Sequence, residues 1–367
     1  MTKTDHSTAP LESPDEAVLR LEAGANAVAI DLALGNVAAL DLGGIAPLHR
    51  APWLDEPEVQ ADKAIPLVDR RLSGDFFCLP FGCNDVEPGP PHGWTANSPW
   101  QVVAQGATWA RMVLGIAVFG ARVEKEIALA PDAPILYQRH RISGGQGDVT
   151  LAHHPMVSFA TTARLFLSPK RRVIAAQTPL EPGRNRLAAG AECNDPAAVP
   201  AADGGQVDLT RLPIGTRHED FVTLIEEDGR QIGWTAILRE TEGDIVFILK
   251  NARNLPLTML WHSNGGRDYA PWNGRHRNVL GIEDGRAAGE LGHAGALGPS
   301  VYRRNGIAAT QALGHEIVVP HVIGAIPRPE GWDRITDIVV DGGRLTLCGG
   351  PGQEVVLPFE AGFLDLP

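Results

Sequence analysis

The sequence predicts an all-β protein, one large antiparallel β-sandwich whose loops build a site on one face. Many short segments alternate apolar with polar residues, as half-buried strands do, and turn signals such as Asp228-Gly229 stand between them. Convincing amphipathic helices are almost absent, so the chain lacks the alternation of strands and helices that builds parallel sheets. No internal repeat with a period of about 20 to 50 residues is visible. A large sandwich is the architecture that these observations favour.

The chain is long enough for a large core. It has 367 residues, of which 44% are hydrophobic and 21% charged, an ordinary globular composition. Length alone would suggest two domains, but large all-β domains run long as single units. We therefore predict a single domain over residues 17–367. Residues 1–16 are polar and predict a flexible tail, and they lack the apolar segment of a signal peptide.

Charge and motif content argue against several classes of function. The net charge is −12, so the surface repels nucleic acid and anionic membranes, and we expect neither as a partner. No apolar run approaches the length of a membrane span. The four cysteines are scattered without zinc-finger spacing, and no nucleotide-binding or GxSxG fingerprint occurs. We expect a cytoplasmic enzyme or binding protein that uses no cofactor.

The first hundred residues predict a meander of short strands and then a long loop region. The segment 28–32 alternates as a half-buried strand does, and glycines punctuate the short runs around it. Residues 45–100 are rich in proline, which cannot donate to a β-ladder, so this region is not the interior of a sheet. Long structured loops in compact domains are more often functional than idle.

The β signal is strongest in the region that follows the proline-rich loops. Turns rich in proline, glycine and aspartate separate the successive strands expected there, which are 112–119, 122–129, 135–142 and 149–155. Residues 178–216 are again rich in proline, glycine and alanine, and they predict a long surface loop.

Sheet is predicted to resume in the second half of the chain. The strands expected there are 221–226, 232–238, 244–250, 255–261 and 279–282, and then 317–323, 335–340, 345–348 and 355–359. The strand 279–282 is apolar and stops at Glu283, a carboxylate that follows Trp272 and Arg275 in the chain. The mixed segment 284–314 predicts short helical turns.

Three histidines and one glutamate stand out as candidates for chemistry. His92 lies in a Pro-His-Gly turn, His154 ends a strand before a proline, and His262 follows a tryptophan at a strand end. A lone histidine in a β protein is more often structural or exposed than functional. His153 and His154 point to opposite faces of a strand and cannot easily share a metal ion, so we expect no metal site. Glu283 could be a buried base or a solvated strand cap.

Tryptophans and arginines near these groups could bind a polyhydroxylated ligand. Tryptophan usually packs in the core, but it also stacks on the apolar face of a sugar ring. Arginine can hydrogen-bond to hydroxyl groups or simply remain solvated. The substrate-binding residues that we predict are Arg71, Trp94, His262, Arg267, Trp272 and Arg275.

The order of three short motifs along the chain is informative. PHGW contains His92, HHPMVSF contains His154, and VLGIEDG contains Glu283. In this order they resemble the aldose 1-epimerases, or galactose mutarotases, and their relatives. RVEKEIALAPDAPILYQRHRISGG looks like the central strand–turn–strand of that family, and DLGGIAPLHR looks like part of its opening meander. Each motif is weak alone, and the three in the right order are more specific.

The resemblance implies a β-supersandwich fold and the interconversion of the α and β anomers of an aldose. By analogy, Glu283 would be the general base that takes the proton from the C1 hydroxyl, and His154 the general acid that protonates the ring oxygen. His92 would hold a sugar hydroxyl or the ring oxygen and assist. Acid and base act on two oxygens attached to one carbon, and a glutamate with a histidine can supply that pair without a metal.

Two features depart from the pattern of that family. Met156 stands where an aromatic residue usually follows the His-Pro pair, and SGDFFCLPFG replaces the usual asparagine-rich sugar-contact motif. In this respect the chain is more similar to side branches of the family than to its galactose-specific members, and the identity of the sugar stays open.

Two other functions are compatible with the same residues. One is a non-catalytic carbohydrate-binding or sensing protein on the same fold, since fold does not fix function. The other is a hexose-6-phosphate epimerase, whose phosphate contacts would come from Arg70, Arg71, Arg267 and Arg275. The sequence does not indicate an oligomeric state.

Overall fold

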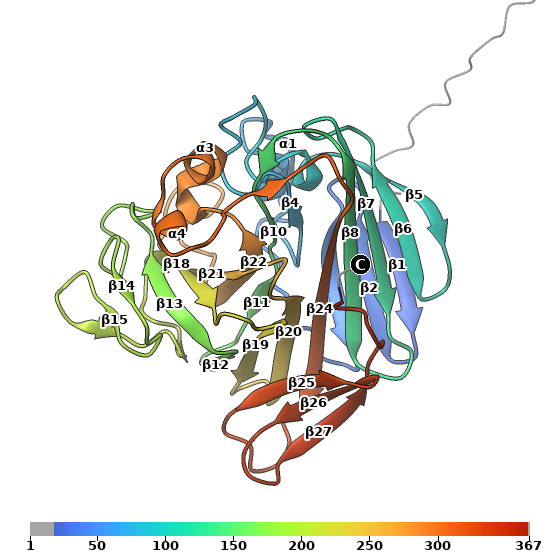
Figure 1. Ribbon diagram of the computed structural model, residues 1–367, viewed down its shortest axis with the longest axis vertical. Helices are drawn as coiled ribbons and strands as arrows, with labels where there is room; N and C mark the ends of the chain where they lie inside the picture. The colour runs from blue at the N-terminus through green and yellow to red at the C-terminus, as the bar shows by residue number, and fades with distance from the viewer. Residues whose placement is uncertain (1–17, 366–367) are drawn as a thin grey trace, which may run out of the picture.

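Two large β-sheets pack face to face in the computed structural model, which describes residues 18–365 (Figure 1). The strand pairs that build both sheets are antiparallel. The predicted all-β sandwich is therefore confirmed. The flexible tail predicted over residues 1–16 lies outside the described residues.

The larger of the two sheets has nine strands. In spatial order they are β17 (Arg211–Leu212), β12 (Ala163–Leu167), β19 (Ile232–Arg239), β20 (Asp244–Asn251), β24 (Ile317–Pro327), β8 (Ile135–Gly144), β7 (Ala121–Leu129), β6 (Trp109–Leu114) and β5 (Trp100–Gln105). Half of the neighbouring pairs are sequential strands, and β24 lies between β20 and β8, which are distant in the chain.

The second sheet has eight strands and carries the candidate site. In spatial order they are β14 (Glu192–Cys193), β13 (Lys170–Ala175), β18 (His218–Glu226), β21 (Leu257–Asn264), β22 (Val279–Arg286), β10 (Leu151–His153) and β4 (Phe77–Cys78), and β11 (Met156–Ser158) also pairs with β22. Thus β10 and β11 share one neighbour and leave a short break between them.

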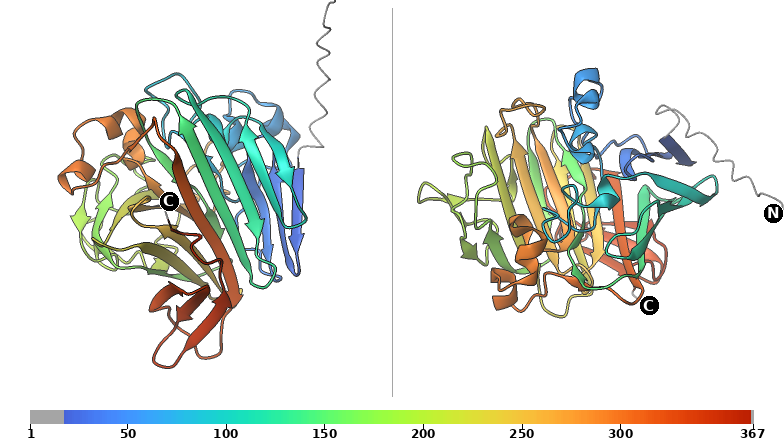
Figure 2. Two further views of the ribbon diagram at one scale, coloured as in Figure 1. Left: turned by 45° about the vertical axis from the view of Figure 1, so that its right-hand side comes forward. Right: turned by 90° about the horizontal axis from the view of Figure 1, so that it is seen from above.

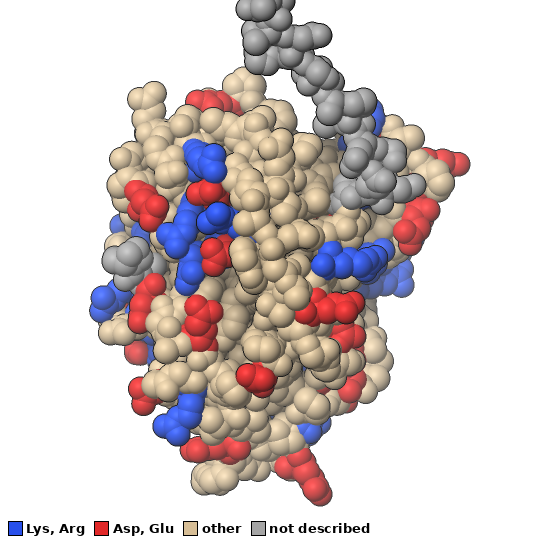
Figure 3. All heavy atoms as spheres, turned by 90° about the vertical axis from the view of Figure 1, so that its right-hand side faces the viewer, with Lys and Arg blue, Asp and Glu red and all other residues tan. Residues whose placement is uncertain are grey.

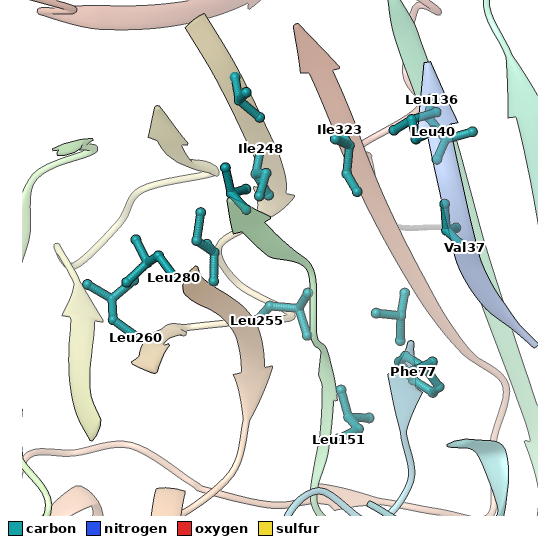
Figure 4. Close-up of a cluster of buried hydrophobic side chains, with 14 of the residues drawn as sticks. Val37, Leu40, Phe77, Leu136, Leu151, Ile248, Leu255, Leu260, Leu280 and Ile323 are labelled. Atoms are coloured by element: carbon teal, nitrogen blue, oxygen red, sulfur yellow. The ribbon is translucent and has the colours of Figure 1, made fainter. Parts of the chain in front are cut away.

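Apolar side chains from the inner faces of both sheets form the main core (Figure 4). Ile248 and Ile323 come from the nine-stranded sheet, and Leu260 and Leu280 come from the eight-stranded sheet. All four are buried, and each such side chain stabilises the fold by about 1.5–3 kcal/mol. This core holds β21 and β22, and with them the residues of the site, in a fixed position.

Strand β20 is apolar on both faces because both faces are covered. Val246 and Ile248 point into the main core, whereas Ile245 and Phe247 belong to a second cluster on the outer side of the sheet. A strand buried on both sides reads as a continuous apolar run rather than as an alternation, which explains the run IVFIL in the sequence.

Smaller sheets extend the sandwich (Figures 1 and 2). One three-stranded sheet joins the main core, and another covers the outer face of the nine-stranded sheet. The first consists of β1 (Val18–Ala23), β2 (Asn26–Asp31) and β3 (Asn36–Leu42), and the second of β25 (Asp337–Asp341), β26 (Arg344–Cys348) and β27 (Glu354–Pro358). The short pairs are β9 (Asp148–Val149) with β23 (Gln311–Ala312) and β15 (Val199–Pro200) with β16 (Gln206–Val207).

Residues 45–100 are mostly loops, as expected, and their one short strand, β4, lies at the edge of the eight-stranded sheet. The region also contains α1 (Pro57–Ala61), α2 (Leu67–Arg70) and η2 (Trp94–Ala96). Trp53, Phe76 and Phe81 from this region pack in one cluster with Trp261 and Trp272. The loop region is therefore anchored on the sheet by aromatic packing.

The predicted short helical turns within 284–314 are present. They are η3 (Gly289–Leu291), α3 (Gly292–Leu297) and α4 (Val301–Arg304). Figure 1 shows α3 and α4 together at one end of the eight-stranded sheet, near β18 and β21. The expected surface loop over 178–216 contains the four short strands β14 to β17.

One strand is shorter than the sequence predicted. The strand expected over 112–119 is β6, which ends at Leu114. Phe119 and Gly120 adopt positive φ angles of 50° and 75°. These angles turn the chain back into β7, because an antiparallel neighbour must begin there.

Glu283 lies inside a strand rather than at its end, which corrects the prediction. β22 continues past it to Arg286. Asp284 and Gly285 look like turn residues in the sequence, but Gly285 keeps the register with β21. The Asp284 carboxylate is buried and pairs with Lys250 at 2.8 Å. This ion pair compensates the buried carboxylate, and β22 can therefore continue through Asp284 and Gly285.

Positive and negative side chains are interspersed on the face of the molecule that Figure 3 shows. That face offers no broad basic surface to a polyanion, in keeping with the net charge of −12. Among residues 18–365, no helix combines the length and apolar character that crossing a membrane requires.

Candidate active site

A cavity of about 260 Å³ lies where the loop region meets the eight-stranded sheet. Its wall residues come from distant parts of the chain, and they include Phe76, His92, His154, Trp261 and Glu283. Sites for drug-sized ligands measure about 300–1,000 Å³. The cavity is therefore suited to one smaller molecule, such as a monosaccharide.

Glu283 projects from β22 into this cavity. Its side chain is 2% exposed, and its Oε1 lies 3.0 Å from Nε2 of His154. Gly281, two residues earlier on the same face of the strand, leaves space for it, because a Cβ there would lie 2.8 Å from that Oε1. The second oxygen, Oε2, is buried and has no hydrogen-bond partner among the described residues. A ligand hydroxyl could satisfy it.

His154 is fixed in position by its backbone and by stacking. Its backbone N–H donates to Oδ1 of Asp75 at 2.9 Å and to the carbonyl of Phe76 at 3.0 Å. The imidazole stacks on the ring of Phe76, with centroids 4.3 Å and planes 20° apart. Its Nδ1 is buried without a partner in the described chain. His154 and Glu283 therefore form a contact pair in which each member keeps one unoccupied polar atom.

His92 faces His154 across the cavity, with ring centroids 5.3 Å apart and planes at 89°. Its φ angle of 62° is uncommon for a residue other than glycine. The next residue, Gly93, has a φ of 74°, and a Cβ there would lie 2.0 Å from the carbonyl oxygen of Leu79. Burial, with the positive charges of His154 and Arg267, lowers the pKa of His92 to about 3. The imidazole is therefore neutral at neutral pH.

Trp261, Trp272 and Arg267 form one wall of the cavity. The guanidinium of Arg267 lies over both indoles, 5.2 Å from the Trp261 ring and 4.4 Å from the Trp272 ring. Glu181 pairs with Arg267 at 3.2 Å. The indole N–H of Trp261 donates to Oε2 of Glu219 at 2.9 Å, which fixes the ring. This wall combines the apolar surface of two indoles with the hydrogen-bond donors of a guanidinium, and both can contact a sugar.

Two further carboxylates line the cavity, Asp69 of α2 and Glu290 of η3. Burial raises the pKa of both groups. Oε1 of Glu290 accepts a hydrogen bond from the backbone N–H of Gln177, whereas its Oε2 is buried without a partner among the described residues. Among the described residues that line the cavity, Arg267 is the only lysine or arginine. The lining thus contains three carboxyl groups and one guanidinium.

Arg71 and Trp94 do not line the cavity, although we predicted both as substrate-binding residues. Arg71 pairs with Asp31 at 2.7 Å and so ties the loop region to the end of β2. Trp94 begins η2 and is 38% exposed. The helical turn of α2 points successive side chains in different directions, and as a result Asp69 reaches the cavity while Arg71 does not.

His262 and Arg275 also lie outside the cavity. Side chains alternate along β21, so Trp261 faces the cavity and His262 faces the opposite side. Burial lowers the pKa of His262 to about 3. Arg275 pairs with Glu56 on the surface. From the same predicted set, Arg267 and Trp272 do line the cavity, together with the three predicted catalytic residues.

A cluster of potential metal ligands, Asp75, His153 and His321, lies behind the cavity, with ligand atoms within 4.8 Å of one another. The two imidazoles stack in parallel, with centroids 4.0 Å and planes 9° apart. A metal ion lies in the plane of each imidazole that binds it, so parallel stacked rings cannot both aim at one ion. Each ring already bonds a different carboxylate, His153 to Asp75 and His321 to Asp284, both at 3.2 Å. The cluster is a buried polar network that supports β10, β22 and β24.

Sequence reasoning did not single out Phe76, Phe81, Asp69 or Glu290 as parts of a site. The one signal for the two phenylalanines was the segment SGDFFCLPFG, which departs from the family pattern. No sequence signal distinguishes Asp69 and Glu290 from acidic residues that face solvent, because the packing of the loops decides whether a side chain faces the cavity.

The two sheets, their strand order and the cavity at one end define a galactose mutarotase-like β-sandwich. A candidate aldose 1-epimerase from Escherichia coli K12 superposes with a TM-score of 0.58 at 15% identity, over 84% of this chain and 98% of that one. A galactose mutarotase related enzyme from Lactobacillus acidophilus gives 0.52 at 12% identity, over 85% and 98%. Galactose 1-epimerase from Lactobacillus acidophilus NCFM gives 0.51 at 11% identity, over 84% and 94%.

These similarities establish the fold, as the resemblance in the sequence implied. No protein-family model matches the chain, and no curated protein matches it. At such low identity the activity has to be argued from the geometry of the cavity itself.

Proposed function

We propose that this protein is an aldose 1-epimerase, which interconverts the α and β anomers of an uncharged aldose by opening and closing the sugar ring. The observation that carries this proposal is the 3.0 Å contact between Glu283 and His154 in a cavity of monosaccharide size. Both oxygens that exchange protons are bonded to C1, so the acid and the base must be immediate neighbours. Trp261 and Trp272 add apolar surface next to this pair.

Ring opening requires one proton to be removed and one to be added. Glu283 takes the proton from the C1 hydroxyl while protonated His154 gives a proton to the ring oxygen. The bond between C1 and the ring oxygen breaks, and the electrons of the former O–H bond complete the carbonyl of the open-chain aldehyde. Rotation about C1–C2 presents the other face of the carbonyl. The reverse transfers then close the ring and restore both groups, so no net proton is consumed.

The charges around the cavity favour an uncharged aldose over a sugar phosphate. Asp69, Glu283 and Glu290 line the cavity and would repel a phosphate. Three of the arginines that might have contacted a phosphate do not line the cavity and are engaged by other groups: Arg70 by the carbonyl of Gln60, Arg71 by Asp31 and Arg275 by Glu56. The hexose-6-phosphate alternative therefore has little support from this geometry.

The proposal is tested by measuring anomer exchange directly. Saturation-transfer NMR on a panel of aldoses, such as glucose, galactose, xylose and arabinose, should show exchange that rises with protein concentration. Glu283→Gln and His154→Gln should each abolish most of it, whereas His262→Gln, a histidine variant outside the cavity, should keep it. If a sugar raises the melting temperature but none of the aldoses exchanges faster, the protein is a carbohydrate-binding protein and the proposal fails.

We also place this reaction in the cytoplasm. All four cysteines are free thiols, and free thiols are typical of reducing compartments. Fractionation of the source cells, followed by detection of the protein with an antibody, tests this placement, and recovery outside the cytoplasm would overturn it.

A further inference from the structure

Cys78 contacts His92 in the wall of the cavity. Its Sγ lies 3.3 Å from Nδ1 of the imidazole, within hydrogen-bond distance for sulfur. Cys78 is the last residue of β4 and is fully buried, and β4 pairs with β10 at Ala152, two residues before His154. The thiol is thus built into the sheet, whereas His92 comes from a separate loop.

The loop holds the imidazole of His92 firmly against this thiol. The backbone N–H of His92 donates to the carbonyl of Gly82 at 2.8 Å. The side-chain amide of Asn97 donates to the carbonyls of Pro91 and Gly93 at 2.9 and 2.8 Å. The rings of Phe76 and Phe81 meet the imidazole edge-on, with centroids 5.5 and 5.4 Å away. The contact between Cys78 and His92 is therefore a fixed feature of the cavity.

The chemistry of the two groups decides which nitrogen of His92 carries the proton. Burial, with the charges of Glu283 and Asp75, raises the pKa of the Cys78 thiol well above its usual range, so the sulfur keeps its hydrogen. A thiol is a weak donor and its sulfur a weak acceptor, whereas an unprotonated imidazole nitrogen accepts well. In the described chain the sulfur has no other hydrogen-bond partner. The S–H group therefore donates to Nδ1.

We propose that Cys78 is a positioning residue that holds His92 as the tautomer protonated on Nε2, so that His92 presents a permanent hydrogen-bond donor to the cavity. A neutral imidazole that accepts at Nδ1 must carry its proton at Nε2. Among the described residues the one hydrogen bond of the His92 ring is that at Nδ1, and the residue lines the cavity. The group that Nε2 meets in a complex is an acceptor, which for a sugar is a hydroxyl or the ring oxygen.

The expected effect of Cys78 on the rate of anomer exchange rests on the proposed function, but the tautomer of His92 does not. In ring opening, a fixed donor on the ring oxygen stabilises the negative charge that develops there as the bond to C1 breaks. Because His92 does not change its own protonation, it complements His154 and Glu283, which exchange protons. A loss of Cys78 would leave both tautomers of His92 accessible and would weaken this donor.

The tautomer can be read without any assay of activity. Long-range ¹H–¹⁵N correlation spectra of the full protein labelled with ¹⁵N-histidine distinguish a protonated from an unprotonated ring nitrogen, and His92→Gln identifies the signals of His92. We expect Nε2 protonated and Nδ1 unprotonated in the wild-type protein between pH 6 and 8. Protonation at Nδ1 in the wild-type protein would overturn the proposal, and this outcome requires no variant of Cys78.

Two variants of Cys78 then separate positioning from packing. Cys78→Ala removes the donor and should give a mixture of tautomers, and it should lower kcat by roughly two- to tenfold, the size of one neutral hydrogen bond. Cys78→Ser restores a donor and should recover both the wild-type tautomer and most of kcat. An unchanged tautomer in Cys78→Ala overturns the proposal. If no aldose exchanges at all, the proposed function fails while the tautomer result still decides the role of Cys78.

Discussion

Glu283 lies directly opposite His154 in the register of the eight-stranded sheet. β10 pairs Ala152 with Gly285, and β11 pairs Met156 with Gly281, so the break between β10 and β11 falls opposite Glu283. His154 occupies this break and can turn its side chain toward the carboxylate, 3.0 Å away. Interruptions of a β-ladder are frequent next to active sites because they re-aim a side chain. Backbone pairing, rather than flexible loops, thus brings the proposed acid and base together.

Replacing the proposed base should abolish exchange without unfolding the protein. Glu283→Gln keeps the size of the side chain and can still contact His154, but it cannot take a proton. We expect saturation-transfer NMR to show a rate at least about 100-fold lower, the lower end of what general acid–base catalysis contributes. Glu240→Gln, on the exposed turn between β19 and β20, should leave the rate unchanged. A wild-type rate in Glu283→Gln would remove this residue from the mechanism.

The space beside the carboxylate should be as important as the carboxylate itself. A Cβ at Gly281 would lie 2.8 Å from Oε1 of Glu283, so Gly281→Ala should displace the carboxylate from His154. We expect anomer exchange to fall by roughly ten- to a hundredfold, since a misplacement of about 1 Å can cost that much. Gly298→Ala is the control, because a Cβ there would lie 4.0 Å from its nearest neighbour. Equal rates in the two variants would contradict this account.

The carboxylates around the cavity should exclude anionic sugars. Glucose 6-phosphate and glucuronate should react with a kcat/KM at least about tenfold below that of the neutral sugar, because like charges a few ångströms apart repel strongly in a partly buried site. Glu290→Gln should narrow this difference in kcat/KM by removing one carboxyl group from the cavity lining. Steady-state kinetics on matched neutral and charged substrates measures both effects. A preference for the phosphate would favour the sugar-phosphate epimerase instead.

The two arginines from the predicted set should behave differently. Arg267 lines the cavity, so Arg267→Met should raise KM roughly tenfold or more, the size of a hydrogen bond to a charged group. Arg275 pairs with Glu56 outside the cavity, and both side chains are partly exposed. Arg275→Met should therefore leave KM and kcat within about twofold of wild type and change stability little. If KM rises in Arg275→Met but not in Arg267→Met, the substrate does not bind in this cavity.

Buried neutral histidines should make the fold sensitive to mild acid. Burial lowers the pKa of His49 and His153 to about 4 and that of His262 to about 3, from an ordinary value of 6.5. Between these values the unfolded chain binds protons that the folded protein does not. The contribution of these histidines to the free energy of unfolding is therefore fully present above pH 6.5 and is lost as the pH drops from 6.5 toward 3, by up to about 1.4 kcal/mol per pH unit for each histidine.

Thermal or urea unfolding at several pH values between 7 and 4.5 measures this loss. Carboxyl groups whose pKa burial raises, such as Asp69 and Glu290, act in the opposite direction, so a histidine variant is needed to isolate the histidine contribution. His262→Gln should reduce the slope of the free energy of unfolding against pH by the contribution of one proton. This reduction is expected whatever the variant does to stability at pH 7. An identical slope in the variant would show that His262 is not held neutral in the folded state.

Much of the fold followed from local pattern, and part of the site did as well. β7 alternates buried with partly exposed residues, as ARVEKEIAL predicts, because one of its faces covers the main core. His92, His154 and Glu283 share the cavity, as the order of their motifs implied. The strand boundary at Glu283 was wrong because the partner of Asp284, Lys250, is distant in the chain and invisible to a local rule.

The sequence by itself determined the all-β character, the loop region and the three groups proposed for chemistry, because alternation, proline content and short motifs are local properties. Only the tertiary structure decided which neighbours of those groups face the cavity. Arg71 and Asp69 are two residues apart, and His262 and Trp261 are adjacent, yet in each pair one member lines the cavity and the other does not. That choice depends on strand register and on how the loops pack on the sheet, and both are set by contacts between residues far apart in the chain.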